Sequence, residues 1–386
     1  KGHIWSLAPE ALPAPIGSEI VRPLASLKTV PVPEPTNLAD FVADKQAAIQ
    51  LGKALFWDSQ VGSDGKTACA SCHFQAGADI RSRNQIDPDI RGGDSTFQLA
   101  TPNYQLQPRD FPLTKHVDAG IAGSPITTDT NDIISSQGVM LHNFKSIASG
   151  SPVDNCAYVA DSVFNVGGIN VRRVEPRNTP SAVNAIFNFR NFWDGRANNI
   201  FNGVNPFGPR DVTAAIWKYD GTNMVSTTVA IDNASLASQA VGPPGSLFEM
   251  SCDKRTLADI GRKLVNSNLK PLGQQMVDPK DSVLGVIAGS QAKKIQNGLT
   301  VTYQDLIQKA FRKEYWAGGT IAGPQKYSQI EGNFSLFFGL SVQLYEATLV
   351  SNNTPFDQFM EGNGNALTQS QQVGLSVFVG QGLCIN

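Results

Sequence analysis

The chain has 386 residues, of which 41% are hydrophobic and 17% charged, and its formal net charge is -2. This length allows two or three domains, and the composition is that of a folded globular protein. A charge so close to zero gives no electrostatic case for a nucleic-acid or acidic-membrane partner, and no apolar run reaches the ~18 residues of a membrane span.

The predicted elements are an extended arm followed by helices and long loops. Residues 1–43 are rich in proline and weakly periodic, whereas apolar residues recur at helical spacing over 44–57. Residues 77–170 hold many Gly, Asn, Asp and Ser, which predicts surface loops with short helices. Helical patterns return in three segments: 256–266, 303–316 and 327–350. A capping box of Thr368 and Gln371 opens a last helix, and the fold class predicted is mainly α-helical.

Cys69-Ala70-Ser71-Cys72-His73 is a C-x-x-C-H motif, the attachment signal for c-type haem. On one helical turn the two thiols reach the two vinyl groups, and the adjoining histidine comes beneath the iron as proximal ligand. The alternatives are a redox pair, which needs a thioredoxin-like βαβ setting, and a zinc half-site, which needs a second Cys/His pair nearby. Coincidence is a third, but chance gives this pentapeptide in only roughly one in a thousand such chains. Because neither context is present, the motif predicts covalent haem c.

Four blocks of sequence, in the same order, resemble the bacterial dihaem cytochrome c peroxidases and their MauG-type relatives. The blocks are LGKALFWDSQVGSDGKTACASCH, RNTPSAVNAIFNFRNFWDGRA (177–197), LASQAVGPPGSLFEM (236–250) and NTPFDQFMEGNGNALTQSQQVGLSVFVGQGLC (353–384). Long segments at about 80–172 and 200–235 separate blocks that the family usually joins more directly. The chain therefore resembles an enlarged member whose insertions form loops.

The resemblance implies two cytochrome-c-like haem domains and two haems. We expect the arm at 1–43 to precede an N-terminal, peroxidatic haem domain at 44–285. Residues 286–386 would begin a C-terminal, electron-transfer haem domain that is incomplete in this chain. A second C-x-x-C-H motif beginning at Cys384 would need Cys and His as its next two residues. We therefore expect the protein to continue past Asn386.

The resemblance also implies roles for residues around the haem that His73 would ligate. Glu249 and Gln239 match the acid–base pair over the reactive haem, where a carboxylate takes a proton from peroxide and returns it to the departing oxygen. Trp193 matches the tryptophan that relays electrons between the haems, and Arg196 suits a haem propionate. As isolated residues, the glutamate would more often be a loop carboxylate and the tryptophan a core residue.

Two further ligand positions follow from the resemblance. Asn178 matches a ligand of a structural calcium ion between the domains, whose other ligands would lie beyond this C-terminus. Many members hold a distal histidine soon after the first motif, but the next histidines here are His116 and His142. Either one of them serves from within the insertion, or the haem stays open as in MauG-type members. Because most isolated histidines are structural, we favour the open haem.

Cys156 and Cys252 lie in inserted or divergent regions. Haem of this type is attached outside the cytoplasm, where thiols oxidise, so we expect a disulfide between them and a periplasmic or secreted bacterial protein. Two unpaired buried thiols are the alternative.

The sequence thus predicts a dihaem c-type peroxidase. It would reduce hydrogen peroxide, or use it to oxidise a partner, with electrons from a small redox protein passing from the second haem through Trp193. A homodimer is also compatible with the sequence. Two alternatives stay open: a dihaem oxygenase of the rubber-cleaving sort, against which Gln239 and Glu249 argue, and a pure electron-transfer cytochrome with two six-coordinate irons.

Overall fold

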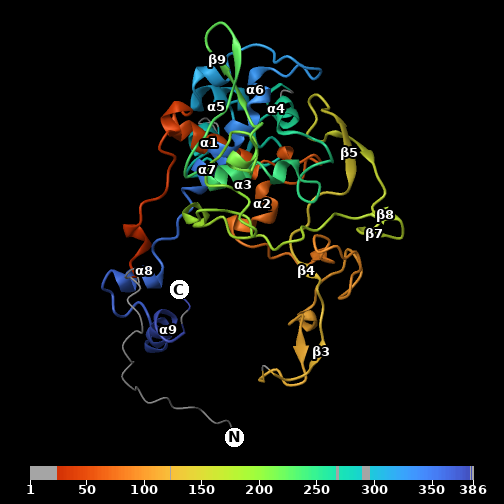
Figure 1. The fold of residues 1–386 in the computed structure, drawn as a ribbon, viewed down its shortest axis with the longest axis vertical. Helices are drawn as coiled ribbons and strands as arrows, with labels where there is room; N and C mark the ends of the chain where they lie inside the picture. The colour runs from red at the N-terminus through yellow and green to blue at the C-terminus, as the bar shows by residue number, and fades with distance from the viewer. Residues whose placement is uncertain (1–23, 122, 267–268, 289–295, 383, 385–386) are drawn as a thin grey trace. The chain divides into compact units, whose positions relative to one another are not determined.

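The computed structural model divides into two compact units (Figure 1). The described residues are 24–121, 123–266, 269–288, 296–382 and 384. The larger unit runs from Val32 to Val350, and the smaller one combines the described residues up to Pro31 with those from Ser351 onward. Within the described residues, the larger unit holds α1 to α7 and all strands, whereas the smaller unit holds α8 and α9.

Helices form the centre of the larger unit. They are α1 (Lys45–Trp57), α2 (Cys69–Cys72), α3 (Ser235–Ala240), α4 (Leu257–Asn266), α5 (Tyr303–Ala310), α6 (Gln329–Gly332) and α7 (Phe334–Glu346). All 13 residues of α7 are buried, and α1, α3 and α4 pack against it (Figure 1). The apolar face predicted over 327–350 is therefore part of the hydrophobic core of this unit.

The local sequence explains α1 and its packing. The Asp44 side chain caps the helix by accepting a hydrogen bond from the Ala47 backbone N at 3.0 Å, and the apolar residues at helical spacing are buried as predicted. A Cβ atom at Gly52 would lie 1.8 Å from the carbonyl oxygen of Ser341 on α7. Only a glycine therefore permits the close crossing of these two helices.

Strands in the described part of the larger unit form two-stranded antiparallel ribbons. The pairs are β1 (Ile86–Asp87) with β4 (Ile133–Ile134), β2 (Lys115–His116) with β3 (Ile126–Thr128), β5 (His142–Ser146) with β6 (Asn155–Tyr158), β7 (Asn165–Val166) with β8 (Ile169–Asn170), β9 (Ile216–Tyr219) with β10 (Met224–Thr227), and β11 (Met276–Val277) with β12 (Gln296–Asn297). The first four ribbons lie within 77–170, where short helices were predicted. Segments without helical periodicity pair as strands instead. The strands β7 and β8 pair across a turn, whereas β1 and β4 pair across the intervening ribbon of β2 and β3. The fold is therefore a helical core with small ribbons and is not plainly mainly α-helical.

The ribbon of β5 and β6 is fastened to the core beside α4. A disulfide joins Cys156 on β6 to Cys252, with 6.5 Å between the two Cα atoms, which confirms the predicted pairing. Asp154, fully buried, forms ion pairs with the Nε atom of Arg255 at 2.8 Å and the Nζ atom of Lys263 at 3.0 Å. Two kinds of cross-link therefore hold the inserted segment against the residues that follow position 249.

The smaller unit contains α8 (Pro355–Met360) and α9 (Gln369–Val379). The predicted capping box is present at α9, where the Thr368 hydroxyl accepts a hydrogen bond from the Gln371 backbone N at 3.3 Å. Among the described residues, no helix is long and apolar enough to cross a membrane.

Candidate functional site

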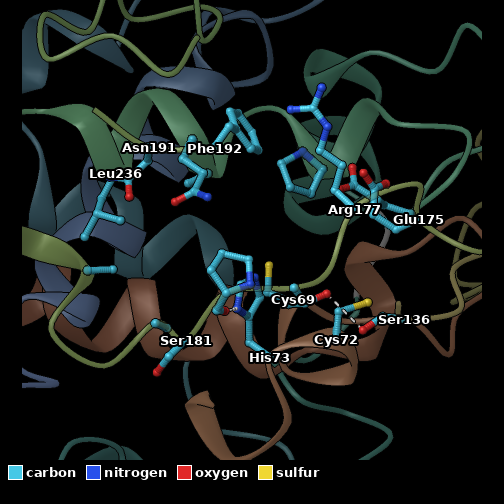
Figure 2. A pocket seen from close by; sticks show the side chains of 18 of the residues that line it. Cys69, Cys72, His73, Ser136, Glu175, Arg177, Ser181, Asn191, Phe192 and Leu236 are labelled. Atoms are coloured by element: carbon cyan, nitrogen blue, oxygen red, sulfur yellow. Dashed lines mark hydrogen bonds between the residues drawn. The ribbon is translucent and has the colours of Figure 1, made fainter. Parts of the chain in front are cut away.

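A cavity opens beside α2 in the larger unit. It encloses about 1130 Å³ of empty space, part of which is open to solvent, and we call it the α2 cavity. Its walls come from α2, from the loops around 175–182 and 191–196, from α3, from residues 248–250 and from the end of α7. Figure 2 shows Cys69, Cys72 and His73 on one side, facing Asn191 and Phe192.

The thiols of Cys69 and Cys72 face this cavity from one turn of helix (Figure 2). Neither is in a disulfide. Burial raises the pKa of Cys72 to about 12 and the pKa of Cys69 further above its usual value, so both thiols are neutral. A reactive redox cysteine or a zinc ligand needs a lowered pKa, and the described residues contain no Cys, His, Asp and Glu cluster suited to a metal ion. Two adjacent neutral thiols fit covalent attachment of haem better than either alternative.

His73 presents one ring nitrogen to the cavity. Its Nδ1 atom lies 2.9 Å from the carbonyl oxygen of Pro180. Because a carbonyl oxygen only accepts, Nδ1 carries the proton and Nε2 keeps a free lone pair. Burial lowers the pKa of His73, so the ring stays neutral. A neutral imidazole held through Nδ1 is the usual arrangement of a metal-binding histidine.

Glu249 and Gln239 both line the α2 cavity, so the fold brings together the pair named from the sequence. Burial raises the pKa of Glu249, although hydrogen bonding from Ser246 and the charges of Arg196 and Arg91 act in the opposite direction. This buried carboxyl group therefore holds a proton more readily than an exposed one.

The backbone at Glu249 is shaped by the inserted segment. A Cβ atom at Gly138 would lie 1.9 Å from the carbonyl oxygen of Phe248 and 2.7 Å from the Cα atom of Glu249. Glycine is therefore required where this segment crosses the cavity wall, and any side chain there would displace Glu249.

Trp193, Asn178 and Arg196 also line the cavity. The indole Nε1 of Trp193 donates to the Asn178 carbonyl oxygen at 2.7 Å, while 67% of the tryptophan surface is exposed. Arg196 lies over the ring of Phe192, 3.9 Å from its centroid, and pairs with Asp194 at 2.8 Å. Arg196 thus already has a carboxylate partner, and a haem propionate would have to share it.

Sequence reasoning missed four charged residues in the wall: Arg91, Glu175, Arg177 and Glu346. Burial and the charge of Glu249 raise the pKa of Glu175 to about 9, and burial raises the pKa of Glu346 to about 8. The available signal for Glu175 was its position two residues before the block 177–197, and for Glu346 it was a charged residue inside the apolar helical pattern over 327–350. Arg91 lies in the polar segment 77–170, where no motif marks it.

The other candidate ligands lie elsewhere. Of the described residues that line the cavity, only His73 is a histidine. His116 is on β2, and its Nδ1 atom lies 2.7 Å from the carbonyl oxygen of Ser124. His142 is on β5, and its Nδ1 atom lies 3.2 Å from the carbonyl oxygen of Met140. Cys384 is an exposed free thiol in the smaller unit, and its predicted role in a second haem motif stays a prediction.

Comparison with known proteins adds a family match. A family model described as di-haem cytochrome c peroxidase matches residues 46–108 and 154–365. The cytochrome-c peroxidase IdrP2 of Denitromonas iodatirespirans is 41% identical over 61 residues, which are 16% of this chain and 16% of the relative. The cytochrome-c peroxidase IdrP1 of the same organism is 44% identical over 66 residues, which are 17% of this chain and 16% of the relative. The cytochrome c551 peroxidase of Pseudomonas aeruginosa is 24% identical over 207 residues, 54% of this chain. These matches span 16%, 16% and 35% of the relatives' own lengths.

Proposed function

Because the chain belongs to the di-haem cytochrome c peroxidase family, we propose that it reduces hydrogen peroxide at a haem held in the α2 cavity. The carrying observation is the convergence of four groups on this one cavity: the two neutral thiols of α2, the free Nε2 of His73, and the carboxyl group of Glu249. These groups can attach, ligate and supply protons within a single space.

The residues present fit a covalently bound haem. Both cysteines of α2 and His73 line this one cavity, so a single group bound in it can reach all three side chains. Cys69 and Cys72 would form the thioether links, and Nε2 of His73 would ligate the iron. When bound, the haem supplies the electron chemistry of peroxide reduction.

The chain's own residues handle the protons. In this proposal Glu249 accepts a proton from peroxide and delivers it to the departing oxygen, so that this oxygen leaves as water. The amide of Gln239 can donate a hydrogen bond that orients the substrate. The buried setting of Glu249 supports this role, because burial raises its pKa and so favours the proton-bound form in which it can deliver the proton to the departing oxygen.

Electrons would arrive from a small redox protein, or leave a protein substrate, through Trp193. Its large exposed fraction, with the indole edge held by Asn178, favours exchange with a protein over a purely internal relay. The same proposal includes the passage of electrons from a second haem, a contact of Arg196 with a haem propionate and a calcium ion at Asn178. It also includes the domain limits at 44–285 and 286–386 and a periplasmic location.

The test is the substitution Glu249→Gln in the haem-loaded protein. We expect the absorption spectrum to be retained and the reaction with peroxide to slow by a factor on the order of 10² or more. Stopped-flow mixing with peroxide measures this rate, and Glu314→Gln, a carboxyl group outside the cavity wall, is the matched control. Unchanged kinetics in Glu249→Gln would refute the assignment.

A further inference from the structure

A second carboxyl group lies against Glu249 in the α2 cavity. Glu175 is positioned by an irregular pairing of 173–175 with 136–139, in which its backbone N donates to the Ser136 carbonyl oxygen at 2.9 Å. Its side chain is only 15% exposed, and Figure 2 shows it on the cavity wall. The carboxyl groups of Glu175 and Glu249 are within hydrogen-bonding reach of each other.

The polar groups around Glu175 do not satisfy two ionised carboxylates. Its Oε2 atom is buried without a hydrogen-bond partner among the described residues, while Oε1 lies 3.5 Å from the guanidinium of Arg91. Neither of two ionised carboxylates can donate a hydrogen bond, and their like charges repel at this separation. A single proton between them supplies a donor and removes one of the two negative charges.

We propose that Glu175 and Glu249 share one proton, with Arg91 balancing the remaining negative charge, so that the acid–base group of this cavity is a carboxyl pair. The inference rests on the proposed peroxidase function, for which it names a second member of the proton-handling site. Burial raises the pKa of both groups, and the charge of Glu249 raises the pKa of Glu175 further, which agrees with a proton retained by the pair.

A pair of this kind keeps its proton count through the reaction. The ionised member accepts the proton from the near oxygen of peroxide, and the protonated member gives its own proton to the departing oxygen as the O–O bond breaks. The pair starts and ends with one proton. The electrons are those that the proposed peroxidase activity supplies.

Residues 109–153, which the family model does not match, contribute to the wall around the pair. Ser136 and Gly138 come from this segment and line the cavity, whereas Arg91 lies within the matched residues 46–108. Arg91 and Arg196, which is on the loop after Trp193, are charged groups that act on the pair. Because Arg196 already pairs with Asp194, Arg91 is the cation that balances the charge of one carboxylate.

Infrared difference spectroscopy of the oxidised, haem-loaded protein between pH 7 and pH 10 tests the shared proton. In the wild type we expect a C=O band of a protonated carboxyl group to be lost as pH rises. Glu175→Gln and Glu249→Gln should each abolish the same band, since neither member keeps the proton alone. Glu346→Gln, in the same cavity, should remove a different band and leave that of the pair.

Two further measurements separate this inference from the proposed function. Arg91→Gln keeps both carboxyl groups, and loss of the cation should move the disappearance of the band to higher pH. Glu175→Gln should also slow the peroxide reaction about tenfold or more. A band that persists in Glu175→Gln, or an unmoved pH midpoint in Arg91→Gln, overturns the pair even if the wild type reduces peroxide. If the bands behave as expected but the wild type does not react with peroxide, the proposed function fails and the pair stands.

Discussion

Individual side chains around the α2 cavity take their properties from neighbours far along the chain. The Nδ1 atom of His73 is held by Pro180, 107 residues away, and the indole of Trp193 is held by Asn178. A tryptophan with one anchored edge and an exposed face keeps its orientation while it stays accessible to another protein. Position, more than residue type, therefore makes it a candidate electron relay.

We expect Trp193→Phe to leave the haem spectrum intact and to slow electron transfer from an external donor. Phenylalanine is harder to oxidise and lacks the N–H group that bonds to Asn178. Rapid-mixing reduction kinetics measure the effect. Trp57→Phe is the matched control, because its Nε1 also donates a hydrogen bond, at 2.9 Å to Tyr345, but Trp57 does not line the cavity. Equal rates for both variants and the wild type would contradict the relay.

A buried carboxyl group on β1 should make stability depend on pH. Burial raises the pKa of Asp87 to about 6, and its Oδ2 has no hydrogen-bond partner among the described residues. Because the pKa is higher in the folded state, the protonated Asp87 makes a stabilising contribution to the free energy of unfolding. This contribution is fully present below the unfolded pKa of about 3.8 and is lost as pH rises through about 6. Asp87→Asn retains the Oδ1 acceptor for the Ile90 backbone N and removes the charge.

The Asn variant should therefore unfold at a higher temperature than the wild type at pH 8 and at nearly the same temperature at pH 4. The increase at pH 8 should be about 2–4 °C for each kcal/mol by which the substitution raises the free energy of unfolding. Thermal scans by circular dichroism at the two pH values measure this. A variant that is less stable at pH 8 would show that the charge of Asp87 is favourable.

At the scale of elements, the ribbon of β5 and β6 matters because it holds the backbone that follows Glu249. The Asn143 to Asp253 bridge, the disulfide and the ion pairs of Asp154 all join this ribbon to residues 252–263. Together they fix the segment that carries Glu249 between two anchors: Gly138 on one side and Cys252 on the other.

We expect Cys156→Ser with Cys252→Ser to lower the free energy of unfolding by about 2–4 kcal/mol. The sequence separation of 96 makes the closed loop long, so much chain entropy returns to the unfolded state. Denaturation with and without reductant measures the loss, and reduced wild type should match the variant. Mass spectrometry after alkylation without reductant should find neither cysteine labelled in the wild type; labelling of both would disprove the bond in solution.

For the whole molecule, the α2 cavity is a product of nearly the entire larger unit, since its lining extends from Phe56 to Glu346. The family match covers 46–108 and 154–365, and the unmatched residues 109–153 nevertheless supply Ser136 and Gly138 to the wall. Residues 109–153 therefore form part of the cavity wall in addition to covering the surface.

The printed chain contains one complete C-x-x-C-H motif. When these 386 residues are produced in a host that attaches c-type haem, we expect the intact mass to exceed that of the polypeptide by one haem. A haem-bearing peptide should contain Cys69 and Cys72, and Cys69→Ala with Cys72→Ala should yield none. A haem attached through Cys384, or two haems per chain, would contradict this expectation.

Local and covalent features were determined by the sequence alone. The C-x-x-C-H motif is readable because attachment needs two thiols and a histidine within one turn, and α1, α7 and α9 are readable because helical periodicity and capping involve residues three or four apart. The four ordered blocks identified the family, and with it Glu249 and Gln239. The disulfide followed from the expectation that haem of this type is attached in an oxidising compartment, where Cys156 and Cys252 would pair.

Only the tertiary structure decided which distant charges meet. Arg91 and Glu175 are separated by 84 positions (175 − 91), and no period or spacing links them, because their contact depends on how the chain between them folds back over the cavity. The ribbons of 77–170 were not predicted because a polar, glycine-rich sequence shows no clear strand periodicity, and because the partner of β1 is β4, which follows the intervening ribbon of β2 and β3. The exposure of a side chain is likewise decided by the tertiary structure. Trp193 is a residue type that is usually buried in a core, yet it is exposed here.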